Sequence, residues 1–265
     1  MNRFENKTVW ITGASSGIGE ACTYIFAKEK AKLILTGTRV EALKLVQQKC
    51  VELGAECKII PFDLFNIDEI PGLVKDAFSC FGTIDILFNN AGISQRGLAG
   101  DTSFEVDRKI MEINYFAPVR ITKLVLPEMI KQKGGTIAVT SSIAGKFGFP
   151  LRSAYSASKH ALYGFFETLH AEYFSKKIRV VMISPGFINT NISMNALDAD
   201  GKKHARLDAN QAGGMSAEKA AKKIVNAIFH QKPEVFVGSK ELIMVYLKRF
   251  IPALARKLAQ TINPT

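Results

Sequence analysis

Short apolar runs rich in β-branched and aromatic residues recur along the chain, and longer stretches of helical composition separate them. Runs of this length are typical of strands that are buried on both faces of a parallel sheet. Seven are predicted, at residues 9–12, 33–36, 58–62, 84–89, 135–141, 179–184 and 234–237. Because strands that alternate with helices are joined by right-handed crossovers, we expect an α/β fold with a doubly wound parallel sheet of about seven strands. No linker interrupts the pattern, so residues 1–265 are predicted to form a single domain.

Glycines and polar residues gather just after several of the predicted strands. The glycine-rich segment 12–19, Asn90, Ser142 and Pro185-Gly186 each follow the end of a strand. The carboxyl ends of parallel strands meet at one edge of the sheet, and open α/β sheets bind ligands in the crevice outside that edge. The pattern therefore predicts a ligand site there.

The segment 12–19 reads Thr-Gly-Ala-Ser-Ser-Gly-Ile-Gly and lies between a predicted strand and a predicted helix. Glycines at such a turn let backbone N–H groups approach a pyrophosphate and let the helix pack closely on the strand. The phosphate then lies at the positive end of the helix dipole. We therefore predict a dinucleotide cofactor that contacts this segment at Gly13, Ser15, Ser16, Gly17, Ile18 and Gly19.

Tyr155 and Lys159 are four residues apart in a predicted helix, shortly after Ser142. Residues at this spacing share one helical face. A tyrosine is a poor acid or base at neutral pH, and a neighbouring lysine charge would lower its pKa by stabilising the phenolate. The pair alone also fits an ordinary amphipathic helix with a surface lysine, so its meaning depends on the other motifs.

Taken together, Gly-x-x-x-Gly-x-Gly at 13–19, Asn-Asn-Ala-Gly at 89–92, Ser142 and Tyr155-x-x-x-Lys159 closely resemble the classical short-chain dehydrogenase/reductases. The motifs stand in the family order and at the family spacing, and the resemblance extends from about residue 7 to about residue 190. It implies a Rossmann-type fold and hydride transfer between a nicotinamide and an alcohol or carbonyl carbon.

The resemblance also implies a role for each residue of a catalytic tetrad. Tyr155 would be the general acid in reduction and the base in oxidation, and Ser142 would hydrogen-bond the same substrate oxygen. Lys159 would lower the pKa of Tyr155 and bind the nicotinamide ribose, and Asn114 would anchor a water that relays protons. The remaining cofactor contacts implied by the family are Asp63 and Leu64 at the adenine, Asn90, Ala91 and Gly92, and Pro185, Gly186, Ile188 and Thr190 near the carboxamide.

The end of the second predicted strand indicates which dinucleotide is preferred. An acidic residue there would accept hydrogen bonds from the ribose 2′-hydroxyl and favour NAD. The chain instead has Thr38 and Arg39, and a hydroxyl beside a guanidinium can bind a 2′-phosphate. We therefore expect NADP(H) to be preferred over NAD(H), although Ser16 replaces the basic residue of many NADP-dependent relatives.

The substrate pocket is expected to involve residues 94–98, residues 143–151 and the long loop 191–215. Phe147, Phe149 and Leu151 favour an apolar pocket and hence a lipophilic ketone or alcohol. The same side chains could instead pack against a neighbouring subunit, since relatives commonly form homodimers or homotetramers.

The C-terminal segment 240–260 is predicted to be helical and amphipathic. Its apolar stripe is interrupted at Pro252, and residues 241–259 also carry four cationic residues. Core packing, a subunit contact or cover for the pocket is one interpretation, and peripheral contact with an anionic membrane is the other. The stripe comprises Ile243, Leu247, Phe250, Leu254 and Leu258, and the cations are Lys248, Arg249, Arg256 and Lys257.

Composition adds limits rather than a function. The chain has 47% hydrophobic and 22% charged residues, which is ordinary for a globular protein, and we expect no secretory signal or transmembrane helix. The scattered histidines and the absence of Cys-x-x-Cys argue against a metal site and favour reduced thiols in a cytoplasmic protein. The net charge of +11 could favour phosphorylated cofactors or acidic partners, but no nucleic-acid motif accompanies it.

Alternatives from several classes stay open at this point. A β-ketoacyl carrier-protein reductase would suit the basic surface, because its partner is acidic. A non-catalytic NADP(H)-binding regulator would be expected to have lost Tyr155, Lys159 or Ser142, and all three are present. A membrane-attached interaction protein would act through the C-terminal segment. The favoured interpretation is an NADP(H)-dependent oxidoreductase that interconverts a lipophilic carbonyl compound and its alcohol.

Overall fold

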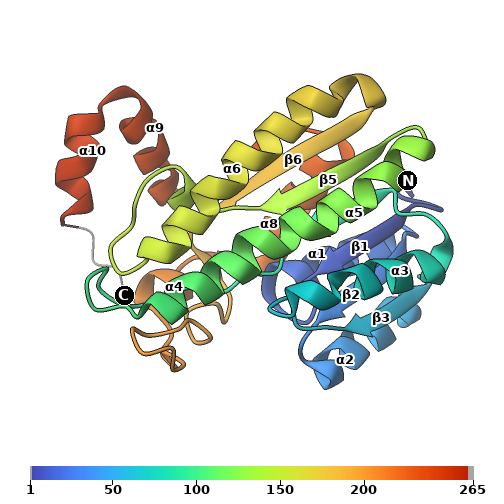
Figure 1. Cartoon of the computed structure of the whole chain (residues 1–265), viewed down its shortest axis with the longest axis horizontal. Helices are drawn as coiled ribbons and strands as arrows, with labels where there is room; N and C mark the ends of the chain where they lie inside the picture. Colours follow the sequence, from blue (N-terminus) through green and yellow to red (C-terminus); the bar gives the residue numbers. More distant parts are fainter. Residues whose placement is uncertain (1, 262–265) are drawn as a thin grey trace.

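Each of the seven apolar runs forms a strand in the computed structural model, which describes residues 2–261 (Figure 1). Within those residues the strands pair in parallel as one sheet of order β3-β2-β1-β4-β5-β6-β9, which confirms the predicted fold class. The strands are β1 (Thr8–Thr12), β2 (Lys32–Gly37), β3 (Cys57–Pro61), β4 (Ile86–Asn89), β5 (Gly135–Thr140), β6 (Ile178–Pro185) and β9 (Glu234–Val237).

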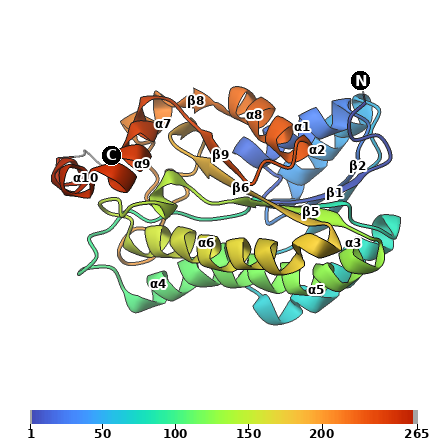
Figure 2. The same cartoon turned by 90° about the horizontal axis from the view of Figure 1, so that it is seen from above.

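Helices cover both faces of this sheet (Figure 2). One layer contains α1 (Gly17–Lys28), α2 (Val40–Glu52) and α8 (Ala217–Phe229), and the other contains α3 (Ile70–Phe81), α4 (Phe104–Met111), α5 (Ala117–Lys131) and α6 (Ser153–Tyr173). Each layer encloses its own apolar core against the sheet. Coverage on both faces explains why the strands read as continuous apolar runs.

The central strand β1 illustrates this double burial. All of its residues are buried, and Trp10 is inaccessible to solvent. The indole Nε1 donates to Thr36 Oγ1 of the neighbouring strand β2 at 2.9 Å, so its polar atom is satisfied inside the core.

Short elements make the connections between these layers. Most are single helical turns, at η1 (Ile67–Glu69), η2 (Glu112–Phe116), η3 (Ile143–Gly145), η4 (Phe174–Lys176) and η5 (Lys240–Leu242). The predicted loop 191–215 contains α7 (Ala209–Ala212), and its two ends are held together by parallel pairing of β7 (Ile188–Asn189) with β8 (Met215–Ser216). This loop is therefore folded onto the carboxyl edge of the sheet.

The C-terminal segment forms two short helices, α9 (Ile243–Phe250) and α10 (Pro252–Ala259). The break falls between Phe250 and Pro252, at the position where the sequence predicted an interruption. Both views show the two helices side by side, projecting beyond the sheet (Figures 1 and 2). Along the described chain no helix combines the length and the apolar character needed to cross a membrane.

Candidate active site

Two adjoining cavities open at the carboxyl edge of the sheet. We call them the outer cleft, of about 420 Å³, and the inner cavity, of about 100 Å³. The outer cleft is lined by the glycine turn after β1, and the inner cavity by Ser142, Tyr155 and Lys159. Ile18, Asn90 and Gly92 line both. Thr140 at the end of β5, and Thr190 and Ile192 after β7, also line both cavities, so the two cavities meet where several strands end.

Two glycine positions of the turn after β1 leave no room for a side chain. Gly13 has a φ of 65°, and a Cβ on it would lie 2.8 Å from Ala91 Cα. A Cβ on Gly19 would lie 2.3 Å from Gly13 O, so α1 packs directly on the turn that precedes it. At the start of α1, Ser16 makes no side-chain capping hydrogen bond, and both Ser16 and Gly17 line the outer cleft. This cradle at a helix N-terminus fits the pyrophosphate of a dinucleotide.

Asn90 ties the ends of three strands together. Its Nδ2 donates to Thr12 O of β1 at 3.1 Å, and its Oδ1 accepts from Thr140 Oγ1 of β5 at 3.2 Å. Thr12 Oγ1 in turn accepts from the backbone N–H groups of Asn90 and Ala91, each at 3.1 Å. The floor between the two cavities is thus fixed by hydrogen bonds that involve the predicted residue Asn90.

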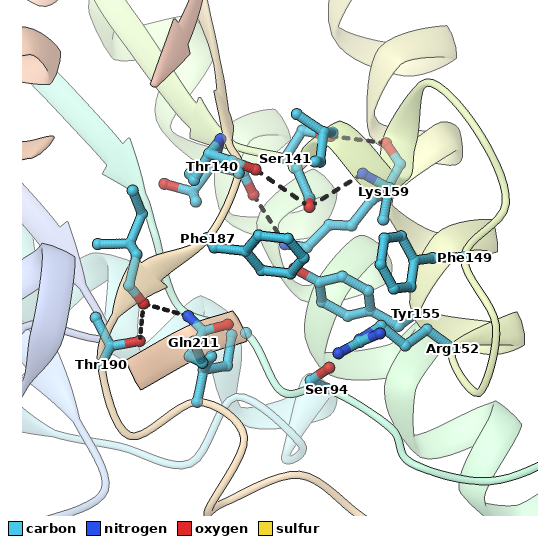
Figure 3. A pocket seen from close by; sticks show the side chains of 18 of the residues that line it. Ser94, Thr140, Ser141, Phe149, Arg152, Tyr155, Lys159, Phe187, Thr190 and Gln211 are labelled. Carbon is cyan, nitrogen blue, oxygen red and sulfur yellow. Dashed lines mark hydrogen bonds between the residues drawn. The ribbon is translucent and has the colours of Figure 1, made fainter. Parts of the chain in front are cut away.

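Tyr155 of α6 (Figure 3) and Ser142, which follows β5, both line the inner cavity. Ser142 caps η3: its Oγ accepts from Ala144 N at 3.1 Å and donates to Pro185 O at 3.4 Å. Ser141, the alternative serine, donates instead to Lys159 O at 3.0 Å. Burial raises the pKa of the Tyr155 phenol, and the serine hydroxyl that opposes this rise is that of Ser142.

Lys159 lies one turn after Tyr155 and is fully enclosed. Its Nζ donates to Thr140 O at 2.8 Å and lies 5.7 Å from the centre of the Tyr155 ring. Burial without a carboxylate partner lowers the pKa of Lys159 to about 7. The ammonium is therefore held at the junction of β5 and α6, beside the point where the cavities meet.

The expectation that Lys159 lowers the pKa of Tyr155 is not met in this structure. Burial raises the pKa of Tyr155, and the groups that oppose the rise are Ser142, Arg152 and Arg96. The physical reason is that the phenol has lost its hydration, while Lys159 is only about half protonated at pH 7 and its Nζ is directed at a backbone carbonyl.

Asn114 lies behind the site rather than in the lining of either cavity. It is buried in η2, a π-helical turn between α4 and α5. Its Oδ1 accepts from Ile93 N at 2.9 Å, and its Nδ2 donates to Ile93 O at 2.9 Å and to Ser158 Oγ at 3.1 Å. A Cβ on Gly92 would lie 3.1 Å from Asn114 Oδ1 and 3.3 Å from Lys159 Nζ, so these two side chains flank the same glycine.

The far end of the outer cleft is lined by the residues that were predicted to contact the adenosine half of the cofactor. Thr38, Arg39, Asp63 and Leu64 all line it. Arg39 Nη2 donates to Ser15 O at 3.0 Å, which draws the guanidinium over the glycine turn. A residue that the sequence did not indicate, Lys203, reaches the same cleft from the loop 191–215. Its position depends on the path of that loop, which no local pattern reveals.

The strand end after β6 completes the inner cavity. The predicted residues Pro185, Gly186, Ile188 and Thr190 all line it. Ile188 O accepts a hydrogen bond from Gln211 of α7, so the loop 191–215 is fastened to this segment (Figure 3). Glu241, which the sequence did not indicate, fastens the other side: its Oε1 accepts from Phe187 N at 2.9 Å.

One wall of the inner cavity is apolar. Phe149, Phe187 and Ile143 line it, and they belong to a buried cluster that also contains Phe147 and Tyr155. The three predicted pocket residues therefore have different positions. Phe149 lines the cavity, Phe147 packs in the cluster behind it, and Leu151 does not line the cavity. Val245 of α9 packs against the same cluster.

Next to this apolar wall, the inner cavity borders a buried ion cluster that the sequence did not predict, and the Arg152 guanidinium of the cluster lies 4.5 Å from the centre of the Phe149 ring. Asp208 Oδ2 accepts from Arg96 Nε at 2.9 Å and from Arg152 Nη2 at 3.1 Å. All three side chains are at most 7% exposed. They come from the loop after β4, the segment before α6 and the loop 191–215, so the cluster holds that loop against the catalytic helix.

The sheet order and the cradle after β1 define a dinucleotide-binding α/β protein of Rossmann type. Comparison with known proteins narrows this class, since the sequence model of the family described as short chain dehydrogenase matches residues 7–201. The chain belongs to the short-chain dehydrogenase/reductase family. It is therefore placed among oxidoreductases that use a nicotinamide cofactor.

Curated relatives and solved structures agree with this placement. Dehydrogenase/reductase SDR family member 7B of Mus musculus is 44% identical over 260 residues, which cover 94% of this chain and 79% of the mouse protein. The SDR family protein 7-like of Drosophila melanogaster is 38% identical over 258 residues, with 96% and 79% covered. A short-chain dehydrogenase/reductase from Burkholderia phymatum in complex with NAD superposes with a TM-score of 0.84 at 25% identity, over 100% and 98% of the two chains.

A further solved structure is similar in fold. It is an alcohol dehydrogenase from the archaeon Thermococcus sibiricus complexed with 5-hydroxy-NADP, with a TM-score of 0.77 and 23% identity over 89% of this chain and 97% of that one. Similar folds therefore occur with both types of dinucleotide, and the fold alone does not distinguish NAD(H) from NADP(H) as the cofactor.

The ion cluster should contribute strongly to stability. Asp208→Ala leaves two buried guanidinium groups without their shared carboxylate, which we expect to lower the free energy of unfolding by about 3–5 kcal/mol. Urea denaturation of the variant and the wild type measures this. Asp200→Ala, which removes an exposed carboxylate of the same loop, is the matched control and should change stability by less than about 0.5 kcal/mol. A loss as small as that of the control would show that the cluster does not hold the loop.

Burial of Lys159 should make stability depend on pH. Its pKa is about 7 in the folded chain and about 10.4 when unfolded, so the unfolded state binds more protons between these values. The destabilisation from burying the charged form is complete below pH 7 and is relieved as the pH rises to about 10, by about 1.4 kcal/mol per pH unit. The stability of Lys159→Met relative to wild type should therefore be highest at pH 6 and decrease toward pH 10, as measured by urea unfolding. Lys123→Met, on the exposed face of α5, provides the control, and a difference independent of pH would contradict the assignment.

Proposed function

We propose that the protein is an NADP(H)-dependent reductase that interconverts a lipophilic ketone or aldehyde and the corresponding alcohol. The observation that carries the proposal is the meeting of Tyr155, Ser142 and Lys159 in the inner cavity, where it opens into the dinucleotide cradle of the outer cleft. A substrate carbonyl in this cavity would lie between the acid and the cofactor.

The bound nicotinamide would supply or accept the hydride. Tyr155 would donate its phenolic proton to the substrate oxygen, and Ser142 would hydrogen-bond the same oxygen as negative charge develops on it. The raised pKa of Tyr155 keeps the phenol protonated at neutral pH, which is the form needed for carbonyl reduction. Lys159 would bind the nicotinamide ribose, and Asn114 would act from behind by holding Ile93 and the wall of the site.

The preference for NADP(H) is supported by the charges at the end of the outer cleft. Thr38 and Arg39 line the cleft at the end of β2, and Lys203 adds a second cation. The nearest carboxylate in sequence, Glu41, pairs with Lys44 on α2 at 2.9 Å. A 2′-phosphate would therefore meet a guanidinium and an ammonium, and the carboxylate that lines the same cleft, Asp63, accepts a hydrogen bond from Phe65 N at 3.0 Å.

A lipophilic substrate is supported by the apolar wall of Phe149, Phe187 and Ile143. The two guanidinium groups that also line the cavity are paired with the Asp208 carboxylate, and that of Arg152 lies 4.5 Å from the centre of the Phe149 ring. A cavity of about 100 Å³ admits the carbonyl and its immediate substituents. The remainder of a large substrate would have to extend past the bordering elements, which are the loop 191–215 and α9.

The role of Tyr155 can be separated from folding and cofactor binding. Tyr155→Phe removes one buried hydroxyl, and we expect turnover of a ketone with NADPH to fall about 10²- to 10⁴-fold. The dissociation constant for NADPH should change less than about twofold, because the ring is retained. Steady-state oxidation of NADPH and quenching of protein fluorescence measure the two quantities. Undiminished turnover would mean that another group is the acid.

Arg39 should discriminate between the two dinucleotides. Arg39→Ala removes a charge-assisted contact to the 2′-phosphate, so the dissociation constant for NADPH should rise about 10- to 100-fold while that for NADH changes less than about twofold. Lys44→Ala, a charge loss on the helix that follows Arg39 and outside the cleft, should leave both constants unchanged. Equal losses for both dinucleotides in Arg39→Ala would rule out the 2′-phosphate assignment.

A further inference from the structure

The C-terminal hairpin formed by α9 and α10 presents an unusual number of large apolar side chains to solvent. Phe250 is 75% exposed and Ile243 is 61% exposed, although both lie in a helix of eight residues. Residues three or four apart share a helical face, so each helix carries one exposed apolar row. The first row consists of Ile243, Tyr246 and Phe250 of α9. The second consists of Ile251, which directly precedes α10, and of Leu254 and Leu258 within α10. We call these six residues the apolar rows.

Cationic side chains flank the apolar rows. Residues 243–261 contain Lys248, Arg249, Arg256 and Lys257 and no aspartate or glutamate. Arg249 directly precedes Phe250, and Lys257 directly precedes Leu258, so each lies about 100° around the helix from an exposed apolar residue. Long cationic side chains in this position can extend to anionic headgroups while the neighbouring apolar side chains enter the acyl region.

The side of α9 away from its apolar row covers the substrate end of the site. Val245 is buried in the cluster that contains Phe149 and Tyr155. The start of the hairpin is fixed by Glu241, whose carboxylate accepts from Phe187 N at 2.9 Å and from Ser239 N at 3.1 Å. A Cβ on Gly186 would lie 2.2 Å from Glu241 Oε1, so the carboxylate fits into a notch beside the inner cavity. The hairpin is therefore fastened to the cavity wall while it projects from the body of the protein (Figures 1 and 2).

Charge favours a lipid surface over a second copy of the chain as the occupant of the apolar rows. A contact between two copies of the hairpin would bring together segments that carry four cations each and no acidic residue. An anionic bilayer neutralises those cations and buries the apolar rows at the same time. Each helix has eight residues, about 12 Å in length, which suits a position in the plane of the interface.

We propose that the hairpin 243–259 docks the protein on the surface of an anionic bilayer, with the apolar rows in the boundary between headgroups and acyl chains. The covered cavity then lies next to the lipid phase, and a lipophilic carbonyl compound reaches Tyr155 from the bilayer past α9. This entry route rests on the proposed function, whereas the docking does not.

Co-sedimentation with vesicles tests the docking on the full chain. The vesicles contain phosphatidylcholine with about one third phosphatidylserine, and phosphatidylcholine alone serves as the uncharged comparison. The wild type should bind the anionic vesicles at least tenfold more tightly than the neutral ones. Phe250→Ser with Leu254→Ser should lower the partition coefficient on anionic vesicles at least tenfold. The matched control is Leu45→Ser with Phe104→Ser, two similarly exposed apolar residues on α2 and α4, and it should bind as the wild type does.

A second pair of variants isolates the charge contribution. Arg249→Glu with Lys257→Glu should abolish the preference for anionic vesicles, and Lys222→Glu with Lys223→Glu on α8 makes the same change of net charge elsewhere and should retain it. All four variants alter exposed side chains, so thermal unfolding should match the wild type.

Wild-type binding by the hairpin variants, or no binding of the wild type, would overturn the proposal. A wild-type dimer that Phe250→Ser with Leu254→Ser converts to monomer, without vesicle binding by either, would assign the rows to a second copy and overturn it as well.

The entry route has its own readout. Turnover of a water-soluble ketone should be the same in the wild type and in Phe250→Ser with Leu254→Ser. Turnover of a ketone presented in anionic vesicles should fall in the variant in proportion to its lost binding. Loss of docking with normal turnover of the soluble ketone supports the docking, whereas a wild type that docks but turns over neither ketone contradicts the proposed function and leaves the docking standing.

Discussion

The parallel ending of β1, β4, β5 and β6 at one edge of the sheet is the constraint on which the site depends. Because these strands pair in parallel register, residues separated by more than 40 positions in sequence arrive at the same edge. The Asn90 side chain turns that proximity into fixed geometry, since it donates to Thr12 O and accepts from Thr140 Oγ1. Thr140 O then receives the Lys159 ammonium. The dinucleotide cradle and the inner cavity are thus positioned by one connected set of hydrogen bonds that begins in the sheet.

Sequence patterns predicted the sheet and the residues that follow its strands, because a buried strand has a continuous apolar signature and its end has a defined location. The glycine turn could be predicted for a related reason. A Cβ at position 19 would clash with the backbone of Gly13, so few residues other than glycine fit there. The contacts between loops were not predicted. Asp208 meets Arg96 across 112 residues, and Glu241 meets Phe187 across 54, and neither pair has a local signature. The direction of the Tyr155 pKa was also wrong, since burial and the orientation of Lys159 depend on tertiary structure.

Burial shifts the pKa values of the two neighbouring catalytic side chains, Tyr155 and Lys159, in opposite directions. Loss of hydration disfavours charge, so the pKa of Tyr155 rises while that of Lys159 falls to about 7. Nearby, the same low polarity makes the attraction between Asp208 and its two arginines strong enough to hold the loop 191–215 in place. The apolar wall that creates this environment is completed by Val245 of α9. The C-terminal hairpin therefore influences the chemistry of the site as well as access to it.

NADPH oxidation by the wild type against a panel of carbonyl compounds, with NADH in parallel, tests the proposed NADP(H)-dependent reduction of a lipophilic carbonyl compound. The panel contains aromatic ketones, steroid ketones, an acetoacetyl thioester and small sugars. We expect turnover of the lipophilic ketones, faster with NADPH than with NADH at equal concentration. Turnover confined to the acetoacetyl thioester would contradict it in favour of a β-ketoacyl reductase. Tight NADPH binding without turnover of any compound would contradict it in favour of a cofactor-binding regulator.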